Sequence, residues 1–453
     1  MNYVFGEDTI DMLLVEGIDP GTLLLILGHP GAGKTTFAVK MLYENVMRYH
    51  VKGVYISFAE TKEKICSFMK RLNVDLKLAE SKGLIEFIQM PTVAGKELLD
   101  VITSVLGKKI INEGYSIAVI DSITPLLNVV TTDEARAYLH TTLYNTMSST
   151  KTLLILIADM PFAAETVDLK GLEFIADAVF VFKTRIEKGL IHRFIEIRKF
   201  RGRPIPAAEI PFSIDDGIGI RTLISPAYLR TPYTASTISY RDTCSDKLWD
   251  PILAGSYIGI ISECNVIPPS ILAMILRLIH SYGLYYGIVS FKEVPEALKN
   301  LLANIARVLK VPPHYILQKS VFIESLNPSA YSTQQVDAFL RSLLEQNVNV
   351  IIIHGAESLY LYHDPLHVDR ILNSISIYAK SGNSVLIEFI DNIYTSTQLM
   401  RYNVIHRVQC LGDKVVHNVV RSRSIGVDLK SFTPISRIDD SMLIDCFEKH
   451  PIT

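Results

Sequence analysis

One short segment carries a glycine pattern that is typical of a phosphate-binding loop. Residues 21–43 read GTLLLILGHPGAGKTTFAVKMLY, in which Gly28, Gly33, Lys34 and Thr35 satisfy the spacing G-x-x-x-x-G-K-[ST]. Glycines let backbone N–H groups curl around phosphate oxygens, and the start of the following helix adds partial positive charge. We expect Lys34 to reach the β and γ phosphates of a nucleotide and the Thr35 hydroxyl to ligate Mg²⁺. The expected nucleotide-contacting residues are Gly28, Gly31, Ala32, Gly33, Lys34, Thr35 and Thr36.

Two acidic residues at strand ends supply the other groups that such a loop needs. The strand predicted in YSIAVIDSITPLL, residues 115–127, ends in Asp121, and a carboxylate there is costly unless it is paired or faces a metal. Asp121 is therefore predicted to hold Mg²⁺ together with Thr35. GVYISFAET, residues 53–61, reads as another strand that ends at Glu60, which we expect to orient or deprotonate the attacking water. The simpler interpretation of either acid is a cap at the end of a strand.

These residues need a parallel sheet and helices to position them. Leu23–Leu27 is apolar enough for a buried strand, and the residues from Thr35 to Arg48 have the spacing of an amphipathic helix. Long apolar runs such as Leu153–Ala158 and Val348–Ile353 have the length of central parallel strands, and they are far shorter than the roughly 18–20 residues that span a bilayer. The pattern predicts an α/β protein without membrane insertion.

Composition and cysteine usage narrow the class of protein. A length of 453 residues predicts two to three domains, and the net charge of −2 gives no overall indication of nucleic acid or an anionic membrane as partner. The cysteines are odd in number and scattered, and no CxxC pair suggests zinc. The expected free thiols are Cys66, Cys244, Cys264, Cys410 and Cys446. Free thiols, with an N-terminus that lacks a signal-peptide pattern, favour a reducing cytoplasm.

Four segments in combination resemble the KaiC-like branch of the RecA/RadA ATPases. They are GHPGAGKTT, VYISFAET, IAVIDSIT, and the late pair GLEFIADAVFVF with RFIEIRKFRG, all within residues 5–222. The resemblance implies a RecA-type twisted sheet, ATP with Mg²⁺, and a homo-oligomer, often a hexameric ring, with ATP between subunits. It also implies that Lys199 and Arg201 in RKFRG reach the γ-phosphate held by a neighbouring subunit. Alternation along the strand places both on one face, although a solvated hairpin is the simpler interpretation of most basic residues there.

The chain departs from this family pattern at one position. The family commonly places two adjacent glutamates after the second strand, whereas this chain has Ala59 followed by Glu60. We therefore expect nucleotide binding to be retained, and hydrolysis either to be slow or to depend on Glu60.

The second half of the chain reads as a copy of the first. PGTLLLILGHPGAGKTTFAVKML aligns with AGSYIGIISECNVIPPSILAMIL, which places Gly28 on Ser262 at an offset of 234 residues. GVYISFAET aligns with YGIVSFKEV, and Asp121 falls on His354, both at an offset of 233. Because a nearly constant offset across several strands is unusual by chance, we predict two tandem RecA-like P-loop NTPase domains with mostly parallel sheets. The expected boundaries are 1–225 and 246–453, joined by a linker at 226–245.

The second copy has lost its chemistry. Lys34 corresponds to Pro268 and Thr35 to Pro269, so the loop lacks its cation and its Mg²⁺ hydroxyl. Two prolines also remove two N–H donors at the point where phosphate would bind. We expect ATP in the first domain alone, with the degenerate domain as a scaffold or a docking surface for a protein partner.

The favoured hypothesis is a Mg-dependent, ATP-hydrolysing, oligomeric regulatory or scaffold ATPase. A first alternative is a non-catalytic ATP-binding switch that signals to a protein partner, which Ala59 favours. A second is a RadA-type recombinase paralogue acting on DNA. Near-neutral charge argues against the second alternative, although a local DNA site around Pro161–Lys170 is left open.

Overall fold

The chain consists of two compact units, Met1–Ile224 and Ser225–Thr453, and each is described by itself. The computed structural model describes residues 2–90, 97–129, 144–161, 169, 171–223, 239–240, 243–244, 252–263, 267–391, 398–411, 414–421 and 436–450. Most of the predicted linker at 226–245 and most of the Pro161–Lys170 segment lie outside these residues. The predicted domain boundaries therefore stay predictions.

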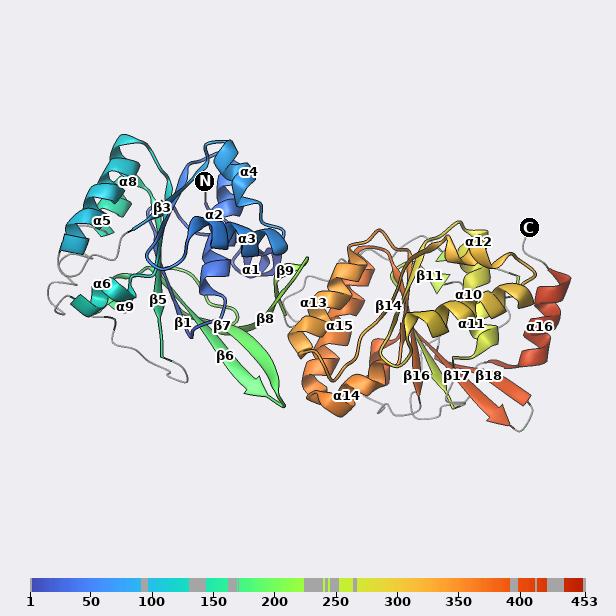
Figure 1. Cartoon of the computed structure of the whole chain (residues 1–453). Coiled ribbons are helices and arrows are strands. Elements are labelled where there is room, and N and C mark those ends of the chain that lie inside the picture. The colour runs from blue at the N-terminus through green and yellow to red at the C-terminus, as the bar shows by residue number, and fades with distance from the viewer. Residues whose placement is uncertain are drawn as a thin grey trace. The chain divides into compact units, whose positions relative to one another are not determined.

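The first unit is built around one sheet with the strand order β3-β2-β4-β5-β1-β6-β7-β8-β9 (Figure 1). The strands are β1 Leu23–Gly28, β2 Gly53–Ser57, β3 Ile85–Gln89, β4 Ile117–Asp121, β5 Leu153–Asp159, β6 Ala178–Glu187, β7 Leu190–Phe200, β8 Glu209–Asp215 and β9 Gly219–Thr222. The pairs from β3 to β6 are parallel, and those from β6 to β9 are antiparallel.

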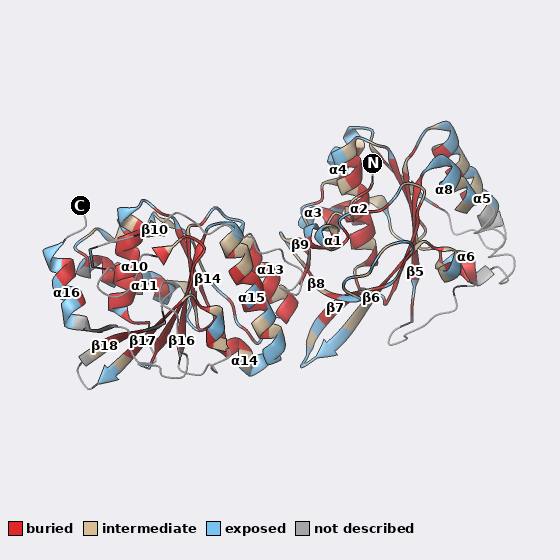
Figure 2. Cartoon of the chain, turned by 180° about the vertical axis from the view of Figure 1, so that it is seen from behind, coloured by how far each residue is buried: buried red, intermediate tan, exposed pale blue. Residues whose placement is uncertain are grey.

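Helices cover both faces of this sheet because its central strands are apolar on both faces. The helices are α1 Asp8–Leu13, α2 Lys34–Tyr49, α3 Lys62–Arg71, α4 Leu76–Ser81, α5 Glu97–Gly107 with a π-helical extension Lys108–Asn112, α6 Thr124–Val129, α8 Asn145–Thr150 and α9 Leu172–Ile175. In β1, Leu24 and Ile26 join the core beneath α2, whereas Leu23 and Leu25 join the core on the opposite face. Figure 2 shows the buried central strands between these layers.

The main sheet of the second unit repeats the order of the first eight strands, from β3 to β8, and no counterpart of β9 lies among its described residues. This sheet has the order β14-β13-β15-β16-β12-β17-β18-β19, with a separate pair β10-β11. The strands are β10 Ser239–Tyr240, β11 Ile252–Leu253, β12 Tyr257–Ser262, β13 Tyr286–Ser290, β14 Ser320–Ser325, β15 Val350–His354, β16 Val385–Asp391, β17 Val404–Leu411, β18 Lys414–Arg421 and β19 Ser436–Asp439. The helices are α10 Pro269–Ser281, α11 Pro295–Val308, α12 Pro313–Leu317, α13 Thr333–Leu344, α14 Leu359–Tyr362, α15 Pro365–Ser381 and α16 Asp440–Lys449, with 3₁₀ turns at Ala356–Ser358 and Gln398–Arg401.

Strand register confirms that the two units are tandem RecA-like domains. In the first unit Ser57 on β2 pairs with Asp121 on β4, and in the second Ser290 on β13 pairs with His354 on β15. Both members of the pair are shifted by 233 residues, which is the offset predicted from the sequence. Helix α10 begins at Pro269 with Pro268 as its N-cap, so the strand–loop–helix framework is kept without the phosphate-binding motif.

The prediction of five free thiols is wrong. Cys244 and Cys446 form a disulfide with a Cα–Cα distance of 5.8 Å, and Cys410 is also disulfide-bonded. The Cys244–Cys446 bond joins residues 202 positions apart, at the start of the second unit and on α16. The sequence did not indicate this pair, because the fold brings together two cysteines that are far apart along the chain. Among the described cysteines, Cys66 is free and buried.

No helix within the described part of the chain is long and apolar enough to cross a membrane.

A pair of histidines lies wholly buried in the second unit. His406 on β17 and His417 on β18 are each 0% exposed, and Nε2 of His406 lies 3.3 Å from Nδ1 of His417. Nε2 of His417 lies 3.5 Å from the Ser270 hydroxyl at the start of α10. Burial and the neighbouring His417 lower the pKa of His406 to about 3. The folded second unit therefore holds the His406 imidazole in its neutral form.

This histidine predicts that acid destabilises the second unit. The folded-state pKa of His406 lies below its unfolded value, so the free energy of unfolding should fall from about pH 6.5 towards 3. We expect a loss of up to about 1.4 kcal/mol per pH unit in that window, because protons bind His406 in the unfolded chain alone. Urea unfolding at several pH values measures this free energy, and hydrogen exchange of β17 and β18 assigns the change to the second unit.

The matched control is His406→Phe, because Phe180 occupies the equivalent position on β6 of the first unit. Its pH profile should be flatter than that of the unmodified chain. Equal slopes in the two proteins would show that His406 does not carry the effect.

Candidate nucleotide site

The candidate site lies where the carboxyl ends of β1, β2, β4 and β5 meet at one edge of the first sheet. Register places Gly28 on β1 beside Asp159 on β5, and Ser57 on β2 beside Asp121 on β4. Ligands of open α/β sheets bind outside the carboxyl ends of the strands. The glycine-rich loop spans the turn from β1 to α2 at this edge, and it positions the residues that the motif predicted.

Two glycines allow the loop backbone to pass where a side chain does not fit. Gly33 is the N-cap of α2 with φ of 101°, and a Cβ there would lie 2.6 Å from the terminal methyl of Ile214. A Cβ on Gly28 would collide with the Phe182 backbone. Among the described residues no side chain caps α2, and its first turn contains no acid. The N–H groups at this helix start therefore suit an anion.

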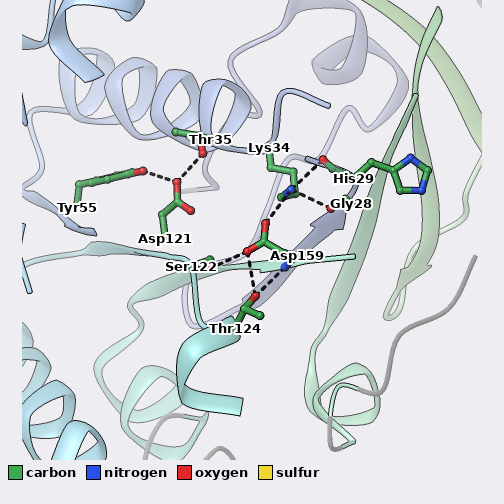
Figure 3. Close-up of polar contacts among 9 residues, drawn as sticks. All are labelled: Gly28, His29, Lys34, Thr35, Tyr55, Asp121, Ser122, Thr124 and Asp159. Atoms are coloured by element: carbon green, nitrogen blue, oxygen red, sulfur yellow. Dashed lines mark hydrogen bonds and ion pairs between the residues drawn. The ribbon is translucent and has the colours of Figure 1, made fainter. Parts of the chain in front are cut away.

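Lys34 is held at the mouth of the loop by three oxygen acceptors (Figure 3). Its buried ammonium donates to the carbonyl oxygens of Gly28 at 2.8 Å and His29 at 3.0 Å. It also forms an ion pair with Oδ1 of Asp159 at 3.1 Å. The only carboxylate among these acceptors is Asp159, so the positive charge of Lys34 is neutralised by one specific acid.

Thr35 and Asp121 come together as the motif predicted. The Thr35 hydroxyl donates to Oδ2 of Asp121 at 2.6 Å, and the Tyr55 hydroxyl donates to the same oxygen at 2.5 Å. Burial raises the pKa of the Asp121 carboxyl above its ordinary value, while both hydrogen bonds lower it in part. Burial and the Asp121 charge raise the pKa of Tyr55 well above its ordinary value, so the phenol stays a donor.

This oxygen pair fits Mg²⁺, which favours hard oxygen ligands and usually keeps several waters beside one or two protein ligands. A half-buried carboxylate next to a threonine hydroxyl, at the start of a helix suited to phosphate, meets that need. The peptide bond between Asp121 and Ser122 is cis.

Glu60 follows β2 and faces the same edge through a short turn. The Ser57 hydroxyl accepts from the Glu60 N–H at 3.0 Å and donates to the Glu60 carbonyl at 2.8 Å. Oε1 of Glu60 accepts from Lys64 at 2.9 Å, and the side chain is 35% exposed. The structure thus keeps Glu60 near the strand end, with its carboxylate paired to α3.

Lys199 and Arg201 lie at the opposite end of the sheet from their own loop. The Arg201 N–H bonds to the Asp177 carbonyl and the Asp177 N–H to the Leu23 carbonyl, which places Arg201 level with the start of β1. Gly28 is five residues further along β1, or about 16 Å at the usual rise of a strand. The strand register therefore separates these cations from the loop of the same chain.

Both cations instead contact residues at and just after the end of α9. The Lys199 ammonium donates to the carbonyl oxygens of Glu173 and Phe174, and Arg201 pairs with Asp177 at 3.0 Å. Burial, with the nearby Arg201 charge, lowers the pKa of Lys199. The Arg201 side chain is 53% exposed.

Sequence reasoning did not assign a role to four polar residues at this edge. They are Tyr55, Ser122, Thr124 and Asp159. Their position at or after strand ends was a usable signal, since Asp159 closes the apolar run LLILIAD. None of the four belongs to the phosphate-binding motif, so the motif did not identify them.

The matching edge of the second unit carries different groups. His354 replaces Asp121, and its Nδ1 lies 3.0 Å from the Ser290 hydroxyl. Lys292 forms an ion pair with Glu357, whose side chain is 2% exposed. Among the described residues of this edge, the hydroxyl–carboxylate pair of the first unit has no counterpart, because Pro269 and His354 stand at the positions of Thr35 and Asp121.

Comparison with known proteins gives the first unit its family. Residues 6–226 match the family model of the KaiC ATPase. The circadian clock oscillator protein KaiC of Synechococcus elongatus is 27% identical over 220 residues, which cover 45% of this chain and 41% of that protein. The circadian clock protein KaiC2 of Synechocystis sp. is 26% identical over 229 residues, covering 49% of this chain and 40% of the relative.

The matched region thus spans about two fifths of the length of these curated relatives. It coincides with the unit that contains the glycine-rich loop, Thr35 and Asp121. The first unit is therefore a KaiC-like domain of the RecA ATPase superfamily.

Proposed function

We propose that the chain binds Mg-ATP in its first unit and hydrolyses it as an oligomeric regulatory or scaffold ATPase. The observation that carries this proposal is the contact between Thr35 and Asp121 at 2.6 Å, beside a loop whose Lys34 ammonium faces the same edge. Backbone N–H groups of the loop would hold the phosphates, with Gly28, Gly31, Ala32, Gly33 and Thr36 shaping it.

The predicted site residues have distinct proposed roles. Thr35 and Asp121 hold Mg²⁺, which when bound neutralises charge on the β and γ phosphates. Glu60 orients the attacking water, and it must first leave its ion pair with Lys64. Lys199 and Arg201 act on the nucleotide of a neighbouring copy, because strand register keeps them away from their own loop.

Assembly and location belong to the same proposal. A nucleotide shared between subunits would stabilise a homo-oligomer, such as a hexameric ring, by mass action. The degenerate unit is proposed to dock a protein partner. The free-thiol argument for the cytoplasm has failed, because Cys244 and Cys446 form a disulfide. The cytoplasm remains our proposed compartment because ATP is supplied there.

A non-catalytic ATP-binding switch is the second candidate, and Ala59 favours it.

Nucleotide binding in the first unit alone predicts about one nucleotide per chain, because Pro268 and Pro269 replace the lysine and threonine of the second loop. Calorimetric titration with Mg-ATP gives the stoichiometry, steady-state ATPase gives the turnover, and light scattering with and without Mg-ATP gives the mass.

Glu60→Gln should slow turnover by about 10²–10⁴-fold while keeping binding, as expected for a lost general base. Binding without turnover in the unmodified chain would favour the switch. DNA-stimulated hydrolysis with a steep salt dependence would favour the recombinase alternative instead.

A further inference from the structure

The Asp159 carboxylate pairs with the Lys34 ammonium, which also donates to the loop carbonyls of Gly28 and His29. Asp159 is the last residue of β5 and lies next to Gly28 in register, with Oδ1 3.1 Å from Nζ of Lys34. The Lys34 side chain is 7% exposed, whereas that of Asp159 is 46% exposed. A ligand that approaches this ammonium therefore meets the carboxylate of Asp159.

Two hydroxyl groups fix the orientation of this carboxylate (Figure 3). Ser122 donates to its Oδ2 at 3.0 Å and Thr124 donates to the same oxygen at 3.2 Å. The Thr124 hydroxyl also accepts from the Asp159 N–H at 2.8 Å. Because Oδ2 is held on the side of β4 and α6, Oδ1 is presented to Lys34. The ion pair is part of a built polar cluster.

None of the roles proposed above uses Asp159. Mg²⁺ is assigned to Thr35 and Asp121, the attacking water to Glu60, and the contact in trans to Arg201. Burial is the main cause of the raised pKa of Asp121, and the negative charge of Asp159 adds to it. The Lys34 ammonium is therefore already paired with the Asp159 carboxylate before any phosphate binds.

We propose that Asp159 competes with the γ-phosphate for Lys34 and so shifts the first-unit site towards nucleoside diphosphates over triphosphates. The inference rests on the proposed nucleotide binding. In phosphate-binding loops this lysine reaches the β and γ phosphates, so a triphosphate brings additional negative charge to an ammonium that is already neutralised. A diphosphate brings less charge and leaves more of the Asp159 contact in place.

Coulomb's law sets the size of the effect. Two like unit charges about 4 Å apart weaken binding by roughly fivefold at the dielectric constant of water and by about 10³-fold at an effective value of 20. Asp159 is about half exposed, so the lower part of this range applies.

Nucleotide titration of the full chain tests the inference without turnover. Dissociation constants for Mg-ADP and for a non-hydrolysable Mg-ATP analogue are measured at low salt in the unmodified chain and in Asp159→Asn. We expect Asp159→Asn to shift the ratio of the two constants at least about fivefold in favour of the triphosphate. Ser122→Ala should shift it in the same direction by less, because it loosens the carboxylate without removing it.

Glu44→Gln is the matched control. It removes the same charge from an acid paired with Lys40 on α2, about 15 Å along the helix from Lys34. Its ratio should equal that of the unmodified chain, and thermal melting should show that all variants are folded.

Three results would count against the inference in distinguishable ways. An unchanged ratio in folded Asp159→Asn overturns the competition with the γ-phosphate alone. Weaker binding of the triphosphate analogue in that variant also overturns it, because Asp159 would then assist Mg²⁺. An unmodified chain that binds neither nucleotide overturns the proposed function and the inference together.

Discussion

Replacing Arg201 by alanine is expected to lower ATP turnover by about 10³–10⁵-fold while leaving Mg-ATP binding close to normal. Arg201 is level with the start of β1, and its own loop follows the end of that strand. In the proposed trans mechanism, this half-exposed guanidinium would reach the nucleotide of a second subunit and stabilise charge that develops during phosphoryl transfer. Steady-state ATPase and calorimetric titration on the same preparation separate turnover from binding.

Arg198→Ala is the matched control for this prediction. Arg198 lies three residues away on β7, at the irregularity in its pairing with β6, and it pairs with Glu196 at 3.0 Å. Its loss removes the same charge and should leave turnover within about twofold. The Arg201–Asp177 ion pair is exposed on the arginine side, so its loss should cost at most about 1 kcal/mol of stability.

A mixing experiment distinguishes action in trans from a structural role. Arg201→Ala retains an intact loop, and Lys34→Ala retains an intact arginine. In head-to-tail assemblies of equal amounts of both, about a quarter of the interfaces join an intact loop to an intact arginine. Activity should therefore return to about a quarter of normal after mixing. Two inactive variants that stay inactive in mixed oligomers, or undiminished turnover in a monomeric Arg201→Ala, would exclude the trans contact.

The parts of the site that the sequence predicted are those governed by local or repetitive rules. Gly28, Gly33 and Lys34 form a contiguous motif between a strand and a helix. The meeting of Thr35 with Asp121 could be predicted across 86 residues because parallel strands end at the same edge of a sheet. The second domain could be predicted because buried parallel strands preserve their register, so its offset survived the loss of the motif.

What the sequence did not show depends on contacts between distant segments. The Asp159–Lys34 ion pair needs β5 beside β1, an order that no local pattern specifies. The Cys244–Cys446 disulfide likewise needs α16 to return to the start of the second unit. The family resemblance pointed to Arg201, but only the strand register shows that it lies at the opposite end of β1 from its own loop.

Replacing Lys34 by alanine is expected to lower the turnover of ATP by about 10²–10³-fold, with a comparable loss of ATP affinity. The ammonium is the single cation that three oxygen acceptors share at the loop mouth. Its removal takes away the contact to the phosphates and also leaves the Asp159 carboxylate without its partner. Phosphate would then meet an uncompensated negative charge, so binding should suffer as well as chemistry.

This double effect makes Lys34 and Asp159 energetically coupled. Lys34→Ala combined with Asp159→Asn should bind ATP more tightly than Lys34→Ala alone, because the uncompensated carboxylate is gone. Lys40→Ala, which removes a cation paired with Glu44 on the same helix, should bind as the unmodified chain does. Calorimetric titration of the unmodified chain, Lys34→Ala, Asp159→Asn and the double variant closes a double-mutant cycle. If Lys34→Ala keeps its affinity within about threefold, the loop does not hold the triphosphate through this residue. Additive effects of the two substitutions on affinity would show that Asp159 acts independently of Lys34.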